Sequence, residues 1–458
     1  MTGFSKEHTT SGLVTQPDEK TMAYETEPDW TPQEEAKAKR KLDLHVVSVL
    51  TLGFFCLQLD RGNIANAITD NFMEDVGIDQ NQFNVGQQLL SLGIVLFEIP
   101  SNMILYRVGP GKWLTLQLFL FGLVSLFQAF QRGYPAFLIT RFLLGATESG
   151  FIPGNQFGAA SSKLLAYGIL YMRGVGGKPG WFWLFVLMGL FTILVGILFG
   201  LVFPDSFKKP YCPFAPGRQV FTDRELYILN TRVILDDPLK GHKKKHIDRK
   251  AFKKAFTNWR IIVHVAITIL NNGPQRGFDT YSPSIIRSFG FEGLTSNALA
   301  SVGLFLQIPV SFSFSYISDH FNKRGPTVIA GVGCHLLGYV MNRIFTEMPG
   351  SMRGVKYFGV IWTQMYGTFP QPLNVAWVSV TCHDSEVRAL AMAIMVMAGN
   401  IAGIYGAQIF REEDNPLYRR GFNIGIGILA ASCCLAIVRY IDSKFLIRRQ
   451  RREEAANE

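Results

Sequence analysis

The residues of this sequence most able to do chemistry are ionisable side chains inside long apolar runs. Asp60 and Arg61 are adjacent in one run, so they point about 100° apart around a helix and are not simply a mutual salt bridge. Arg141 and Glu148 are seven residues apart in another run, two turns along one helix face. Ionisable residues are costly inside a membrane and face a bundle interior or a water-filled cavity.

These side chains have complementary chemistry. An arginine fork suits a carboxylate, a sulfonate or a phosphate. A desolvated carboxylate can take up and release a proton near neutral pH. The four residues therefore predict a proton-coupled anion site. The alternative is an inter-helix charge network that only holds the bundle together.

The composition indicates a membrane protein. The chain has 458 residues, of which 48% are hydrophobic and only 17% charged, whereas soluble proteins carry about 25% charged residues. The mean hydropathy is +0.17, which argues against an ordinary cytosolic enzyme. The net charge is +10, and the basic residues lie between apolar runs. We therefore expect a membrane surface as partner, and no nucleic acid.

Twelve apolar runs in two sets of six predict an all-α polytopic membrane protein. The predicted regions are a cytoplasmic tail (1–43), a first transmembrane bundle (44–203), a cytoplasmic central loop (204–259), a second transmembrane bundle (260–442) and a cytoplasmic tail (443–458). The runs are at about 44–67, 85–106, 112–131, 136–154, 156–173, 181–203, 260–282, 294–318, 325–345, 355–380, 387–410 and 421–442.

The polar segments have their own signals. Residues 1–29 are predicted to be disordered. The first 40 residues are polar and have no apolar central region, so we do not expect a cleaved signal peptide. Capping boxes predict helix starts at Thr31 and Thr222. With both termini inside, the inner segments carry 28 Lys and Arg residues, including the cluster Lys243–Lys245, and the outer loops carry 10. We therefore expect both termini in the cytoplasm.

One region is too short for its predicted topology. The runs from Ala136 to Arg173 provide 38 residues, whereas two crossings alone need about 40, without a loop. The only turn chemistry there is Pro153-Gly154-Asn155. The sequence is therefore compatible with either eleven or twelve membrane crossings.

Several motifs resemble the major facilitator superfamily, in its anion:cation symporter branch, and more closely the fungal allantoate permease family. The resemblance covers about residues 45–445. It implies two six-helix bundles that rock around a central site. By this resemblance Asp60 and Glu148 match proton-coupling carboxylates, and Arg61 and Arg141 match partners for the anion. The motifs are Leu59-Asp60-Arg61-x-Asn63, the Arg141 to Glu148 spacing, Asp319 to Gly325, and the segments 84–111, 164–204 and 297–326.

Further polar residues in the apolar runs are candidate cavity or gate residues. In the inner-loop motif, Asp319, Lys323 and Arg324 are candidates for the inward gate; alternatively, the motif is a basic turn that only sets topology. Gly367, Pro370 and Pro372 predict a broken or kinked tenth helix, either with a role in transport or purely structural. The candidate substrate-binding residues, each alternatively a helix-packing residue, are Arg61, Asn63, Arg141, Asn271, Tyr281, Gln307, Asn374 and Asn400.

Comparison with the resembling family accounts for the short region. Relatives have an end of helix four, a basic loop and the start of helix five where this chain joins Gly154 to Asn155, and about 25 residues are missing here. Helices four and five are therefore expected to be truncated or fused. Three hypotheses remain: an active transporter, a transport-defective isoform, and a transporter-like sensor, against which the short tails argue.

Enzyme and channel functions have weaker support. The sequence contains no Walker loop, and its histidines and six cysteines lack ligand or pairing spacing. Single charged pairs do not form the symmetric rings of a channel. We expect no cofactor or metal, a monomer, and proton-coupled uptake of an organic anion, such as allantoate, nicotinate, another vitamin or a sulfur compound, at the plasma membrane.

Overall fold

The computed structural model describes residues 29–149, 156–205, 211–236, 249–321, 323–382 and 385–457. Three sequence predictions lie outside these residues: disorder up to residue 28, the role of the cluster Lys243–Lys245, and the junction at Gly150–Asn155. Among the described residues, six helices are long and apolar enough to cross a membrane, at Pro32–Asp70, Pro110–Phe130, Gly180–Val202, Leu294–His320, Arg324–Phe345 and Arg419–Leu446.

The described parts of the first half, between Pro32 and Val202, are mostly helical, and each of its apolar runs contains a helix. The predicted capping box at Thr31 is confirmed, because its hydroxyl accepts from Glu34 N and the Glu34 carboxylate accepts from Thr31 N. The helices are α1 (Pro32–Leu42), α2 (Ser48–Ala67), α3 (Phe72–Val76), α4 (Gln80–Val108), α5 (Pro110–Phe127), α6 (Gly133–Glu148), α7 (Gln156–Leu170) and α8 (Gly180–Val202).

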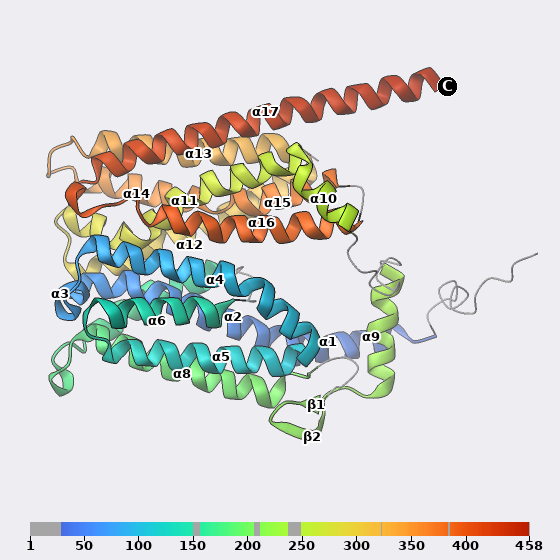
Figure 1. Cartoon of the computed structure of the whole chain (residues 1–458), viewed down its shortest axis with the longest axis horizontal. Helices are drawn as coiled ribbons and strands as arrows, with labels where there is room; N and C mark the ends of the chain where they lie inside the picture. The colour runs from blue at the N-terminus through green and yellow to red at the C-terminus, as the bar shows by residue number, and fades with distance from the viewer. Residues whose placement is uncertain are drawn as a thin grey trace, which may run out of the picture.

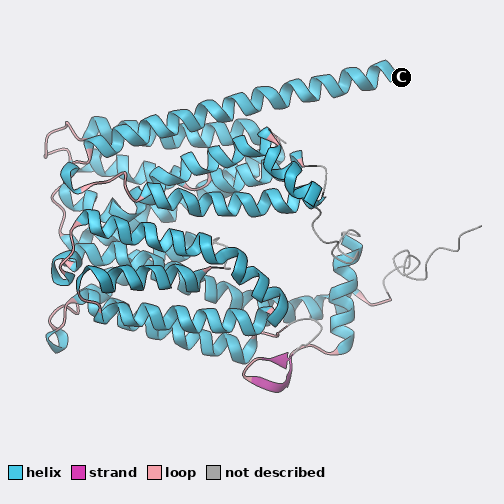
Figure 2. Cartoon of the chain, viewed as in Figure 1, coloured by secondary structure: helices cyan, strands magenta, loops and turns pink. Residues whose placement is uncertain are grey.

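The polar segment between the halves is partly ordered. Strands β1 (Tyr211–Cys212) and β2 (Ala215–Gln219) form an antiparallel hairpin that the sequence did not predict. Helices α9 (Asp223–Asp236) and α10 (Arg249–Thr257) follow. The predicted capping box at Thr222 is confirmed by reciprocal hydrogen bonds with Glu225. Figure 2 shows this hairpin as the one pair of strands drawn beside the helices.

The second half contains the remaining long helices. The predicted break in the tenth helix is confirmed: α14 ends at Gly367 and α15 begins at Pro370, which has no N–H to continue the preceding hydrogen bonds. The helices are α11 (Trp259–Ser288), α12 (Gly293–His320), α13 (Arg324–Phe345), α14 (Arg353–Gly367), α15 (Pro370–Thr381), α16 (Ser385–Gly406) and α17 (Arg419–Asn457).

The helices form two bundles that lie side by side, one with α2 and α4–α8 and the other with α11–α17 (Figure 1). Helices α1, α9, α10 and the end of α17 lie at one end of the bundles, which we call the tail side. Helix α3 lies at the opposite end, the distal side.

Polar contacts join the bundles on the distal side. The Gln80 and Asn84 side-chain amides donate to the carbonyl oxygen of Phe410 over 3.1 Å and 2.9 Å. Asn297 Nδ2 donates to Thr69 Oγ1 over 2.7 Å. All these residues lie near the distal ends of their helices, so the bundles are closed against each other there.

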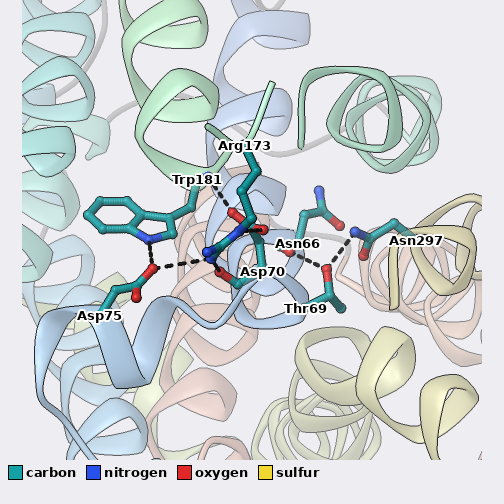
Figure 3. Close-up of polar contacts among 7 residues, drawn as sticks. All are labelled: Asn66, Thr69, Asp70, Asp75, Arg173, Trp181 and Asn297. Carbon is teal, nitrogen blue, oxygen red and sulfur yellow. Dashed lines mark hydrogen bonds and ion pairs between the residues drawn. The ribbon is translucent and has the colours of Figure 1, made fainter. Parts of the chain in front are cut away.

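A distal clasp of Asp70, Asp75, Arg173 and Trp181 anchors the connection that follows α7 (Figure 3). Arg173 Nε donates to Asp70 Oδ1 over 2.6 Å, and Trp181 N donates to Asp70 Oδ2 over 2.8 Å. Trp181 Nε1 donates to Asp75 Oδ2 over 2.8 Å. Asp70 is buried, and its carboxylate thus joins α7 to the start of α8.

Helices α6 and α7 are much shorter than their neighbours. Helix α6 has 16 residues and α7 has 15, or about 24 Å and 22 Å at 1.5 Å per residue. A hydrocarbon core is about 30 Å thick. In Figure 1, α6 begins on the distal side, beside the start of α4 and the end of α5, and does not extend as far toward the tail side as these two helices. The helical part of α6 therefore brings Glu148 to the middle of the bundle.

Candidate functional site

Asp60 is held inside the first bundle by neutral donors. Its carboxylate accepts from Asn63 Nδ2 at 3.0 Å, from Ser125 Oγ at 2.9 Å and from Thr192 Oγ1 at 2.9 Å. Asp60 is 2% exposed. The predicted substrate ligand Asn63 is fully buried and donates to Asp60. Its side chain thus positions the carboxylate, and α2, α5 and α8 together build the Asp60 environment.

Arg61 points to a different partner, as the angle between adjacent helical residues requires. Its guanidinium forms an ion pair with the Glu148 carboxylate, which joins α2 to the end of α6. Glu148 is buried, whereas the Arg61 side chain remains 15% exposed. The second carboxylate oxygen of Glu148 has no hydrogen-bond partner among the described residues. The pair therefore has one open acceptor beside a cation that solvent reaches.

Arg141 lies two turns before Glu148 and is 1% exposed. Its guanidinium lies 5.5 Å from the Phe137 ring centroid and interacts electrostatically with Asp60. Its Nε and Nη2 atoms have no hydrogen-bond partner in the described chain. Helix α6 thus supplies Glu148 to the ion pair with Arg61 and places Arg141 near Asp60. Their seven-residue spacing puts both residues on one face of the helix.

Close backbone packing sets the depth of α6. A Cβ at Gly145 would collide with the Leu90 carbonyl oxygen of α4, and a Cβ at Gly93 would lie 2.8 Å from the Phe142 carbonyl oxygen of α6. Glycine at both positions lets the two helix backbones approach. This approach places Glu148 against α2 and Arg61.

The predicted second-bundle residues divide into two groups. Gln307 on α12 is fully buried, and neither polar atom of its amide has a hydrogen-bond partner among the described residues. Asn400 Nδ2 donates to Glu98 Oε2 over 3.3 Å and so connects α16 to α4 across the bundles. Gln307 thus has polar atoms without a partner among the described residues, and Asn400 forms a hydrogen bond between the bundles.

The other three form packing contacts. Asn271 donates to the Gly367 carbonyl over 3.0 Å, and Asn374 donates to Thr268 Oγ1 over 3.0 Å. Tyr281 donates to Asn84 Oδ1, within the distal contacts. Their observed hydrogen bonds connect helices rather than leave groups open to a ligand.

The inner-loop motif lies on the tail side. The Asp319 side chain is 74% exposed and lies 3.7 Å from an Arg324 nitrogen. Lys323 is exposed. Arg324 Nη1 donates to the Ala376 carbonyl oxygen over 2.7 Å, which ties the start of α13 to α15. Arg324 is thus the motif residue with a direct contact to another helix.

Sequence reasoning missed four ionisable residues: Glu98, Lys163, Arg276 and Asp279. Lys163 of α7 donates to the Asp279 carbonyl oxygen (3.4 Å) and to Ser282 Oγ (3.2 Å) on α11. Arg276 interacts electrostatically with Arg61, Glu148 and Asp279. Glu98 is the partner of Asn400. The signal was present, because each of these residues lies inside a predicted apolar run, which is the criterion that identified Asp60.

Metal chemistry has no support in this part of the molecule. Across the described residues, no group of three or more His, Cys, Asp or Glu side chains is arranged to hold a metal ion. The observed arrangement is one arginine–carboxylate ion pair, Arg61 with Glu148, beside the buried Asp60 and Arg141. Its open donors and acceptors can bind an anion and exchange protons.

The chain resembles fungal transporters along most of its length. It is 27% identical to a protein of Saccharomyces cerevisiae named as an uncharacterized transporter, over 90% of this chain and 81% of that one. It is 24% identical to a major facilitator-type transporter of Emericella nidulans, over 89% of this chain and 84% of that one. An MFS-type transporter of Penicillium expansum is also 24% identical, over 85% and 80% of the two chains.

Solved structures share the fold. A bacterial homolog of the human lysosomal transporter Spinster, described as inward-facing and unoccupied, has a TM-score of 0.62 at 12% identity, over 92% of this chain and 99% of that one. A D-xylose-proton symporter has a TM-score of 0.58 at 16% identity, over 87% and 96%. The sequence model of the Major Facilitator Superfamily matches residues 50–162 and 154–407. The chain is therefore a multi-pass membrane transporter, not an enzyme, and it belongs to the Major Facilitator Superfamily.

Proposed function

We propose that this chain moves a small organic anion across the membrane together with protons, by alternating access. The Arg61–Glu148 ion pair in the middle of the first bundle is the observation that carries the proposal. A proton on Glu148 removes its charge and releases the Arg61 guanidinium. An anion bound nearby then compensates the positive charge that the carboxylate no longer balances, because an uncompensated buried cation is unfavourable. Proton and anion binding are thereby linked.

The distal contacts supply the conformational part of this mechanism. Hydrogen bonds at Gln80, Asn84 and Asn297 close the bundles on the distal side. We propose that the tail side, with α1, α9 and α10, faces the cytoplasm, as the excess of Lys and Arg there favours. The described conformation is then inward-facing, and outward opening breaks these contacts. We expect the plasma membrane as location and a monomer as the working unit.

A second candidate is a transport-defective isoform of the same permease branch, and the short helices α6 and α7 favour it. The match to the yeast relative runs over 451 residues, whereas 90% of this 458-residue chain is about 412 residues. The two superfamily matches also overlap at 154–162, beside the predicted junction. The first observation is consistent with missing residues somewhere in the chain, and the second supports a missing segment between helices four and five. Without it, the first bundle lacks tail-side helix needed to close.

Uptake by yeast separates the two candidates. A strain lacking its own allantoate and nicotinate permeases would express this chain, a version with about 25 family residues restored after Gly154, or E148Q as control. We expect saturable uptake of labelled allantoate or nicotinate that a proton uncoupler abolishes and that E148Q lacks. Uptake by the restored version alone would overturn activity of this chain and establish the defective isoform. Uptake insensitive to both the uncoupler and E148Q would overturn proton coupling.

A further inference from the structure

We propose that Lys163 and Arg276 form a carboxylate-binding position between the bundles, which holds the acidic group of the cargo. The proposal rests on the proposed function and assigns its anion site to residues other than Arg61. Lys163 comes from α7 and Arg276 from α11, on opposite sides of the bundle interface. The two side chains therefore form one binding position only while α7 of the first bundle lies against α11 of the second.

Arg276 is a cation without a direct partner. It is part-buried in the middle of α11. In the described part of the chain, no carboxylate lies within 4.0 Å of its guanidinium, although Glu148 and Asp279 interact with it electrostatically. Its planar fork of five N–H donors is suited to two parallel hydrogen bonds with a carboxylate. An arginine at this depth without such a partner is expected to receive one from a ligand.

Lys163 is positioned by neutral oxygens. Its side chain is 5% exposed and donates to the Asp279 carbonyl and to Ser282 Oγ. Ser282 Oγ also accepts from Gln364 Nε2 over 3.0 Å, which holds the hydroxyl in place. An ammonium has three donors, so one remains after these two contacts. No carboxylate lies within 4.0 Å of this ammonium among the described residues.

Asp279 does not neutralise both cations. Its carboxylate accepts from Gln275 Nε2 over 2.7 Å. Arg276, Asp279 and Ser282 are spaced by three residues and so lie along one face of α11. Once Lys163 packs against this face, two cations share the single carboxylate of Asp279, and the next carboxylate, Glu148, is already paired with Arg61. Two cations without a direct carboxylate partner in a region of low dielectric favour a bound anion.

The surroundings of Arg61 differ in their direct contacts. Arg61 is paired with Glu148 and also interacts electrostatically with Glu98, whereas neither Lys163 nor Arg276 lies within 4.0 Å of a carboxylate among the described residues. The two corners of the site therefore differ in whether their cations are paired. We assign proton exchange to the corner of Arg61 and Glu148, and the carboxylate of the cargo to the corner of Lys163 and Arg276.

Binding to purified full-length protein tests the assignment. The probes are nicotinate and allantoate, with uncharged nicotinamide as a matched control, and the readout is ligand-dependent thermal stabilisation in detergent. We expect nicotinate or allantoate, but not nicotinamide, to stabilise the wild type. R276Q and K163M should weaken this binding about 10- to 100-fold, because each removes a charge-assisted hydrogen bond. R276K should retain part of it, and R287Q, an exposed change on the same helix, should retain all of it.

The outcomes are separable. Equal affinity of R276Q, K163M and R287Q for the carboxylates would overturn this assignment and leave the proposed transport intact. Binding that R276Q abolishes, in a protein without proton-driven uptake, would support the assignment and overturn the proposed transport. A wild type stabilised by neither carboxylate would overturn both. The unliganded melting temperature of each variant, with R276K as the conservative change, separates lost binding from lost folding.

Discussion

The fourth and fifth helices of the first bundle and the tenth and eleventh helices of the second bundle occupy corresponding places in the two sets of six. The first pair is short, with 16 residues in α6 and 15 in α7. The second pair is long: α14 and α15 together run from Arg353 to Thr381 around a break, and α16 has 22 residues. The second pair is therefore long enough to span the bilayer.

The two pairs also differ in chemistry. The short pair carries Arg141, Glu148 and Lys163 at buried positions, whereas the central polar residues of the long pair include the neutral Gln364 and Asn374. The short pair thus carries buried charges of both signs. In the long pair Lys356, near the start of α14, is buried, but the middle supplies neutral packing and a proline break. This division suggests that ion chemistry belongs to the first pair and that spanning and closure belong to the second.

The largest expected effect comes from Glu148, the charged residue at the end of α6 in the short pair. E148Q leaves Arg61 without its ion-pair partner and removes the proposed proton site, and we expect proton-driven uptake to fall about 100-fold or more. N400A, in the long pair, removes one long hydrogen bond, of 3.3 Å, to Glu98 and should reduce uptake only a few-fold. Initial rates in yeast normalised to surface protein give the comparison. Equal losses in the two variants would remove the proposed division of labour.

The second effect concerns how α6 is held. G145A places a methyl group against the Leu90 carbonyl of α4, so we expect a loss of about 1–3 kcal/mol in stability. G168A is the matched change on α7, where nothing lies within 4 Å, and it should be neutral or slightly stabilising. Melting temperatures in detergent measure both. If G145A melts like G168A, close packing does not set the depth of α6.

The third prediction compares charged contacts at the distal ends of the two bundles. D70N weakens the buried carboxylate that binds Arg173 and Trp181, and hydrogen bonds to charged groups contribute about 1.5–3 kcal/mol each. E347Q weakens exposed ion pairs with Arg343 and Arg419 on the second bundle, which contribute about 0.2–1 kcal/mol. Thermal unfolding should show a clearly larger loss for D70N. A larger loss for E347Q would show that the short pair does not depend on its clasp.

The smallest effect is a pH dependence on the tail side of the first bundle. Partial burial tends to raise the pKa of Glu225, but hydrogen bonds from Lys41 Nζ, at 2.7 Å, and from Thr222 N outweigh it and hold the pKa below its usual range. A lowered pKa in the folded state stabilises the α1–α9 contact above the usual glutamate pKa, and this stabilisation is lost as the pH falls through the folded value.

Hydrogen exchange of α1 and α9 measures this loss. Exchange should increase on acidification by an amount equivalent to about 0.2–1 kcal/mol. E225Q lacks the titrating group, so its exchange should show no corresponding step. A step of the same size in E225Q would assign it to another carboxylate, and the second bundle, whose tail side carries α10, should not show the step.

Much of the fold was predictable because it depends on local patterns. Each of the twelve apolar runs contains helix, and the boxes at Thr31 and Thr222 form because their partners lie three residues away. The break before Pro370 follows from proline alone. The hairpin at Tyr211–Gln219 was not predicted, because its register depends on contacts with the end of the first bundle.

The candidate site was predictable only in part. The positions of Asp60, Arg61, Arg141 and Glu148 follow from the cost of burying charge. Their partners do not: Asp60 is bound by Ser125 and Thr192 from two other helices. Arg276 and Asp279 lie in a run whose average hydropathy conceals them. Their relation to Lys163 requires segments more than a hundred residues apart to meet.

The sequence by itself determined the class of protein, the helical runs, the buried charged residues and the shortage of chain between Ala136 and Arg173. These follow from composition, periodicity and length, which are properties of the chain alone. Only the tertiary structure decided which carboxylate meets which cation, where the bundles close, and that Lys163 faces α11. Several side chains of the same type compete for each partner, and helix packing, which no local pattern encodes, selects among them.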